Sequence, residues 1–137
     1  MQTRIKSDTV SSDLAARIKR AENGADIMEA VGLQVVSWAQ GAFRDTSKRP
    51  IPWPARKKGS NPLLKKSGAL HQSIRVASVT NDSVVVGTDR PYAAYHQLGT
   101  KHLPKRPFMP FDNSGKMMPE AQARVMKIIL KKLEGQA

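Results

Sequence analysis

The stretch that decides the fold is NDSVVVGTDRPYAAYHQLGTKHLPKRPFMPF, which runs from Asn81 to Phe111. Asn81 and Asp82 favour a reversal of chain direction, because their side chains hydrogen-bond to their own backbone and tolerate left-handed conformations. The valines that follow favour a strand, which Gly87 ends. We therefore expect a turn followed by a short strand at the start of this stretch.

A short helix is predicted next, from Pro91 to Leu98. Proline suits the first position of a helix, where its missing N–H is no loss. The residues after it give about two turns, and Gly99 suits a left-handed C-terminal cap. We interpret one set of residues as a framework that holds the following loop: Gly87, Tyr92, Tyr95, His96 and Gly99.

The loop after Gly99 carries three cations and two prolines before it reaches Phe108. Prolines make such a loop stiff and extended, and its charges predict exposure. We expect a protruding basic loop beside an aromatic anchor, so its candidate partner-binding residues are Lys101, His102, Lys105, Arg106 and Phe108.

Upstream of the turn, apolar and polar residues alternate from Ile74 to Val79, so a β-hairpin is predicted here. Leu70 is expected to enter the core just before it. Residues 1–10 are polar and mixed, and we expect a flexible lead-in.

Two helices are predicted in the N-terminal third. The first is capped near Ser11 to Asp13 and ends at Asn23-Gly24; the second runs from about Ala25 to Phe43 or Asp45. Trp38 and Phe43 are expected in the core. Gly32 and Gly41 weaken the second helix by about 1 kcal/mol each relative to alanine. They would allow close packing of another helix or of a neighbouring subunit.

A long basic, proline-rich loop or arm is predicted over residues 44–66, with eight basic residues against Asp45 alone. Two interpretations remain open: an arm that docks on a partner ring or DNA, with Trp53 as its anchor, or a solvated loop with Trp53 packed on its own domain. The candidate partner-binding residues of the arm are Trp53, Arg56, Lys57 and Lys58.

The last helix is predicted to begin at Pro119 and to carry an apolar stripe that includes Val125, Ile129 and Leu133. Met126 and Leu130 lie off this stripe, which fits either a subunit interface or a deep groove in the same domain. The fold class is therefore α+β: N-terminal helices, a small, mainly antiparallel sheet of three or four strands, and a C-terminal helix packed on the sheet.

Composition limits the function. The chain has 137 residues, which suits a single domain over 1–137, no cysteine, and a formal net charge of +12. Such a charge favours acidic partners, either nucleic acid or acidic protein surfaces. No apolar run is long enough to span a membrane, so no membrane partner is expected. Without cysteine, a cytosolic place of synthesis is the default.

Motifs for chemistry are missing from the sequence. The three histidines, His71, His96 and His102, form no metal-binding helical pattern, and no nucleophile elbow, phosphate loop or dinucleotide fingerprint occurs. We therefore expect no catalytic residues, no metal, no cofactor and no enzymatic activity.

Several short motifs occur in a fixed order: Ser67-Gly68-Ala69-Leu70, Val86-Gly87-Thr88, Pro91-Tyr92-Ala93, His96-Gln97-Leu98-Gly99 and Arg106-Pro107-Phe108. This order resembles the phage virion morphogenesis family, the tail-completion and neck proteins of long-tailed phages, over roughly residues 25–133. The resemblance implies a structural virion protein at the head–tail joint, assembled in the host cytoplasm.

The resemblance further implies a homo-oligomeric, hexameric ring at the head-proximal end of the tail, which completes the tail for head attachment. Its partners would be the tail tube protein and head-side connector or neck proteins, with packaged DNA nearby. Two other hypotheses remain: a basic nucleic-acid-binding module, whose affinity would fall steeply with salt, and a small nuclease that uses the histidines.

Overall fold

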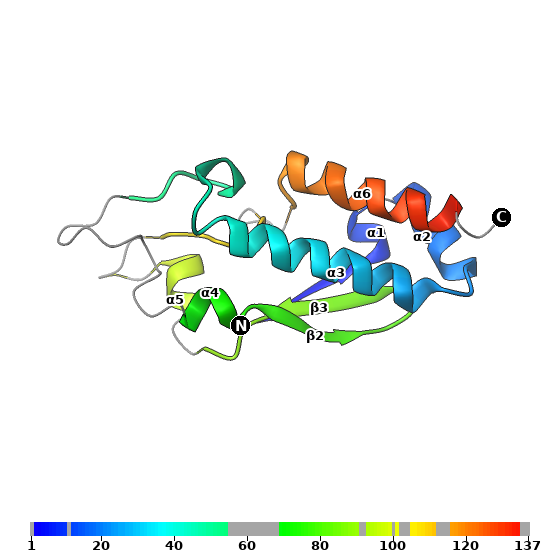
Figure 1. Ribbon diagram of the computed structural model, residues 1–137, viewed down its shortest axis with the longest axis horizontal. Coiled ribbons are helices and arrows are strands. Elements are labelled where there is room, and N and C mark those ends of the chain that lie inside the picture. Colours follow the sequence, from blue (N-terminus) through cyan, green and yellow to red (C-terminus); the bar gives the residue numbers. More distant parts are fainter. Residues whose placement is uncertain are drawn as a thin grey trace.

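The computed structural model places helices over a three-stranded antiparallel sheet (Figure 1). It describes residues 2–10, 12–54, 69–90, 93–99, 101, 105–111 and 116–134. In chain order the elements are β1 (Gln2–Lys6), α1 (Ser7–Val10), α2 (Ser12–Arg20), α3 (Gly24–Gly41), the 3-10 helix η1 (Thr46–Lys48), α4 (Ala69–Ser73), β2 (Arg75–Val79), β3 (Ser83–Gly87), α5 (Ala93–Leu98) and α6 (Pro119–Glu134). The predicted α+β class is confirmed.

The sheet has the strand order β1-β3-β2, so the predicted hairpin of β2 and β3 supplies its centre and one edge. The register pairs Val76 with Val86 and Val79 with Val84, with an irregularity between them. Because β3 is the central strand, every one of its residues is buried.

The first strand corrects the expected flexible lead-in over residues 1–10. Residues 2–6 pair antiparallel with β3, from Gln2 opposite Gly87 to Lys6 opposite Ser83. Ile5, the only large apolar residue of this strand, is fully buried, which gives the strand a side chain that fixes its register. A short strand with one apolar residue gives almost no periodic signal, so the sequence alone pointed to a lead-in.

Helix α3 lies against one face of the sheet, and Gly32 is a position where the two are packed closely. A Cβ atom at Gly32 would lie 2.6 Å from Val84 Cγ2 and 3.0 Å from Val76 Cγ2. The glycine therefore allows the sheet to pack closely on α3, whereas the sequence had suggested close packing of another helix or of a neighbouring subunit. Trp38 and Phe43 belong to the core, as predicted.

Helix α6 begins at Pro119, as predicted, and its main partner is α3, which lies between it and the sheet (Figure 1). Its buried residues are Ala121, Val125, Ile129 and Leu133. Met126 is half-buried against the core while Leu130 is exposed, so α6 fills a groove in its own domain on one side only. None of the helices in the described ranges is long and apolar enough to cross a membrane.

Candidate functional site

The candidate site is the end of the molecule where α3 finishes and α5 lies (Figure 1). We call it the loop end and define it as residues 42–54, 93–99, 101 and 105–108. It contains the described members of the predicted basic arm and basic loop. The remainder of these predicted sites, namely Arg56, Lys57, Lys58, Tyr92 and His102, lies outside the described residues.

Trp53 is packed on its own domain, which was the second of the two interpretations. Its side chain is only 9% exposed. Its indole Nε1 donates a 2.7 Å hydrogen bond to the carbonyl oxygen of Pro107, and its ring meets Phe43 edge to face at 5.8 Å between centroids. The indole therefore ties the first segment of the arm to the basic loop, and its ring is not a free anchor for a partner.

Two arginines fasten the same segment to the rest of the loop end. The guanidinium carbon of Arg49 lies 3.8 Å from the centroid of the Trp53 ring, and its Nε donates to the carbonyl oxygen of Ala42 at 2.7 Å. Arg106 donates from Nε and Nη2 to the carbonyl oxygen of Pro54, at 3.0 and 2.9 Å. A planar guanidinium that donates twice fixes the backbone it binds more firmly than a lysine can.

Phe108, predicted as an aromatic anchor that binds a partner, is instead buried in its own domain. Its side chain is 0% exposed and its ring lies 5.6 Å from that of Phe43, between centroids. An aromatic side chain flanked by prolines in a basic loop looks like a surface feature in sequence. Here Phe108 turns inward and anchors the described part of the loop to the core.

Gln97 is a site residue that the sequence reasoning missed. Its Oε1 accepts two hydrogen bonds, each 3.0 Å long, from the backbone N–H groups of Phe108 and Met109. Backbone N–H groups only donate, so this contact fixes which atom of the amide is the oxygen. Its place in the motif His96 to Gly99 was the only signal, because a glutamine at a helix end has no specific meaning in sequence.

Helix α5 holds the loop through its backbone as well. The carbonyl oxygen of His96 accepts from the N–H of Arg106 at 2.8 Å. Burial, and secondarily the positive charge of Arg106, lower the pKa of the His96 imidazole, so this ring is neutral at neutral pH. The framework role predicted for His96 therefore has a geometric basis, whereas Tyr95 is 53% exposed and points away from the core.

Gly99 caps α5 in the predicted left-handed conformation, with a φ of 76°. Its N–H donates to the carbonyl oxygen of Tyr95 at 2.8 Å, which closes the last turn. A Cβ atom at this position would lie 3.1–3.2 Å from Lys105. The second predicted framework glycine, Gly87, ends β3 where it pairs with β1 and β2.

Replacement of Gly99 by alanine is expected to destabilise the protein by about 1–2 kcal/mol, because an L-residue is strained in the left-handed region. Gly41→Ala is the matched control. Its Cβ would meet only the side chain of Lys48, so helix propensity should offset the contact. Urea denaturation of both variants measures the difference in their free energies of unfolding. Equal urea midpoints for the two variants would show that a side chain at position 99 causes no strain.

Lys101, Lys105 and Arg106 give the loop end its positive surface. Lys101 is exposed, and Lys105 and Arg106 are half-buried. Among the described residues there is no group of three histidines or carboxylates that could hold a metal ion. Lys101, Lys105 and Arg106 therefore make part of the described loop end cationic.

Comparison with known protein families matches residues 5–134 to the phage virion morphogenesis family. That span covers nearly the whole chain of 137 residues. The chain belongs to this family. A search of curated proteins and a search of solved structures each found no match. Family membership makes this a phage protein of virion structure or assembly, associated with the virion.

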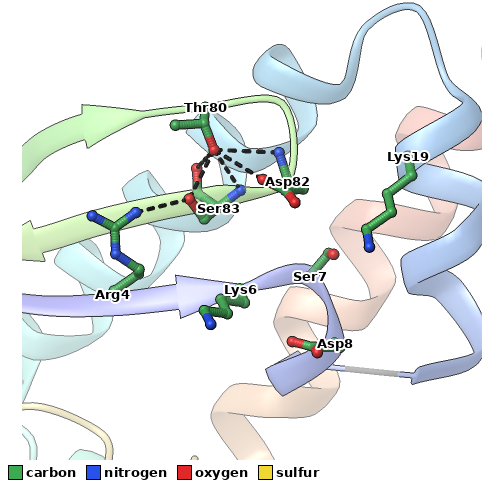
Figure 2. Close-up of a pocket in the computed structure, with 8 residues that line it drawn as sticks. All are labelled: Arg4, Lys6, Ser7, Asp8, Lys19, Thr80, Asp82 and Ser83. Atoms are coloured by element: carbon green, nitrogen blue, oxygen red, sulfur yellow. Dashed lines mark hydrogen bonds between the residues drawn. The ribbon is translucent and has the colours of Figure 1, made fainter.

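The virion morphogenesis protein also has a polar hollow of about 420 Å³ between β1, α2 and the β2–β3 turn (Figure 2). Its charged lining residues are Arg4, Lys6, Lys19, Asp8 and Asp82. Charges of both signs select no single class of ligand. Thr80 also lines the hollow. Its hydroxyl accepts a hydrogen bond from the N–H of Ser83 at 3.0 Å, which closes the turn.

Proposed function

We propose that this protein is a tail-completion or neck protein that forms a ring, with six copies, at the head-proximal end of the phage tail. In this role it completes the tail so that the head can attach. Membership of the virion morphogenesis family supports the general role in virion structure or assembly. The detailed role rests on the construction of the loop end.

The observation that carries the proposal is that hydrogen bonds hold the loop end together while the side chain of Lys101 is exposed at its surface. Trp53 and Arg106 join two backbone segments there that are far apart in sequence, and Gln97 ties the second of these segments to α5. A preorganised loop loses little conformational entropy when it binds, so less of the free energy of its contacts is offset by ordering. This construction suits a protein that must dock at a fixed angle between two larger assemblies.

The proposed partners are the tail tube protein and the head-side connector or neck proteins. The formal net charge of +12 per chain calls for acidic surfaces on those neighbours, or for DNA close to the ring. The tryptophans do not support the alternative hypothesis of a basic nucleic-acid-binding module. Trp38 and Trp53 are both buried, so neither offers the exposed ring on which bases stack.

Extract complementation tests the proposed function. Infected cells that lack this protein are expected to accumulate filled heads and separate tails, and addition of the purified chain should restore joined, infectious particles. Electron microscopy of restored particles should place the protein at the head-proximal end of the tail. Normal particles in the absence of the protein, or salt-sensitive binding to duplex DNA without any complementation, would overturn the proposal.

A further inference from the structure

Helix α3 exposes a stripe that combines acidic residues with a large apolar one. Asp26, Glu29 and Leu33 follow at spacings of three and four residues, so they share one face of the helix. All three are exposed, and the Leu33 side chain is 56% exposed. We call these residues the acidic stripe.

The loop end exposes a patch of the opposite charge. Tyr95 and Leu98 lie one turn apart on α5, and Leu98 is 70% exposed, the largest exposure among the big apolar side chains described. Lys101, which is also exposed, comes two residues after the glycine cap. We call Tyr95, Leu98 and Lys101 the α5 patch.

The two surfaces match in kind. Each joins exposed apolar area to charge, and the signs of the charges are opposite. Exposed leucines are unremarkable singly, but apolar area beside complementary charge is typical of a binding surface. The α5 patch lies at the loop end, whereas Asp26 lies at the other end of α3 (Figure 1). Contact between the charged ends of the two surfaces therefore requires a second copy of the chain.

We propose that the α5 patch of one copy docks on the acidic stripe of the next copy. Leu98 and Tyr95 would cover Leu33, and Lys101 would pair with Glu29. Such a contact joins two different surfaces, so it repeats head to tail and closes into a ring when the rotation between copies allows it. The proposal rests on the ring of the proposed function and identifies the residues that would build it.

Glu29 is the carboxylate of the stripe that is left for a partner. Asp26 already forms an ion pair with Lys132 of the same chain, with 2.9 Å between Lys132 Nζ and Asp26 Oδ2. Within the described residues, no ion pair involves Glu29 or Lys101. A pair between these two residues would therefore form without breaking an ion pair between described residues.

Charge reversal on each surface, followed by mixing, tests the interface. Light scattering on the full chain should show wild-type assembly that weakens with salt. Glu29→Lys alone and Lys101→Glu alone should each weaken self-association at least about fivefold, because each replaces attraction by repulsion. An equimolar mixture of the two variants should restore assembly, since every junction in an alternating ring then joins opposite charges. The same reasoning predicts that the double variant assembles by itself.

Matched controls change the same charges elsewhere. Glu120 and Lys127 lie on the exposed side of α6. The variants Glu120→Lys and Lys127→Glu should therefore assemble like the wild type. Single variants that assemble normally, or a mixture that stays as weak as its components, would overturn the interface and leave the proposed function standing. A wild-type chain that stays monomeric at every concentration would also overturn it. Extract complementation tests the proposed function independently of these results.

Discussion

Phe108→Ala is expected to lower the free energy of unfolding by about 3–5 kcal/mol, the usual cost of removing a fully buried aromatic side chain. The ring is 0% exposed and packs on Phe43, which in turn contacts Trp53. Its loss opens a cavity beneath the basic loop and removes the side chain that holds this loop to the core. Urea denaturation followed by tryptophan fluorescence measures the effect, because Trp53 lies in the same cluster.

Lys105→Ala is the control for this prediction, because it changes the same loop without opening the core. The side chain is half-buried, and its loss is expected to cost less than about 1 kcal/mol. Assembly of the Phe108 variant should fail more severely than that of the Lys105 variant. Equal stability of the two variants would mean that the loop is not anchored through the aromatic cluster.

Gln97→Met is expected to destabilise the protein by about 2–4 kcal/mol, since each part-buried backbone N–H that loses its acceptor costs about 1–3 kcal/mol. The affected groups are the N–H groups of Phe108 and Met109. Methionine has a similar length but only a weak acceptor. Hydrogen exchange at these two amides should accelerate more than exchange within α6.

Gln97→Glu is the control, because it keeps an acceptor oxygen at the same position. It should retain slow exchange at Phe108 and Met109. Fast exchange in both variants would indicate that the shape of the amide, rather than its oxygen, holds the loop. Unchanged exchange in Gln97→Met would show that the two N–H groups find other acceptors.

Features with a local physical cause could be predicted from the sequence. The turn at Asn81 and Asp82, the cap at Gly99 and the start of α6 at Pro119 each depend on residues within one turn of the chain. Their backbone preferences act without reference to the rest of the fold. The α+β class followed from the same local signals.

Features that depend on distant contacts could not be predicted. The strand over residues 2–6 exists because Ile5 meets β3, and the inward turn of Phe108 exists because Phe43 lies beneath it. Gln97 acts on amides more than ten residues away. The sequence also suggested that Phe108 was an anchor for a partner and left two interpretations of Trp53 open. In the structure Trp53 bonds to Pro107 and Phe108 packs on Phe43.

The position of β1 determines when the domain can be finished during synthesis. Its partner β3 lies in the second half of the chain, with Gln2 paired to Gly87. A ribosome adds roughly 5–20 residues per second, so several seconds pass between the synthesis of β1 and that of β3. In that interval neither β1 nor β2 has its partner strand, because both pair with β3. Strand β1 therefore joins the sheet only after β3 has been made, and until then Ile5 has no partner strand.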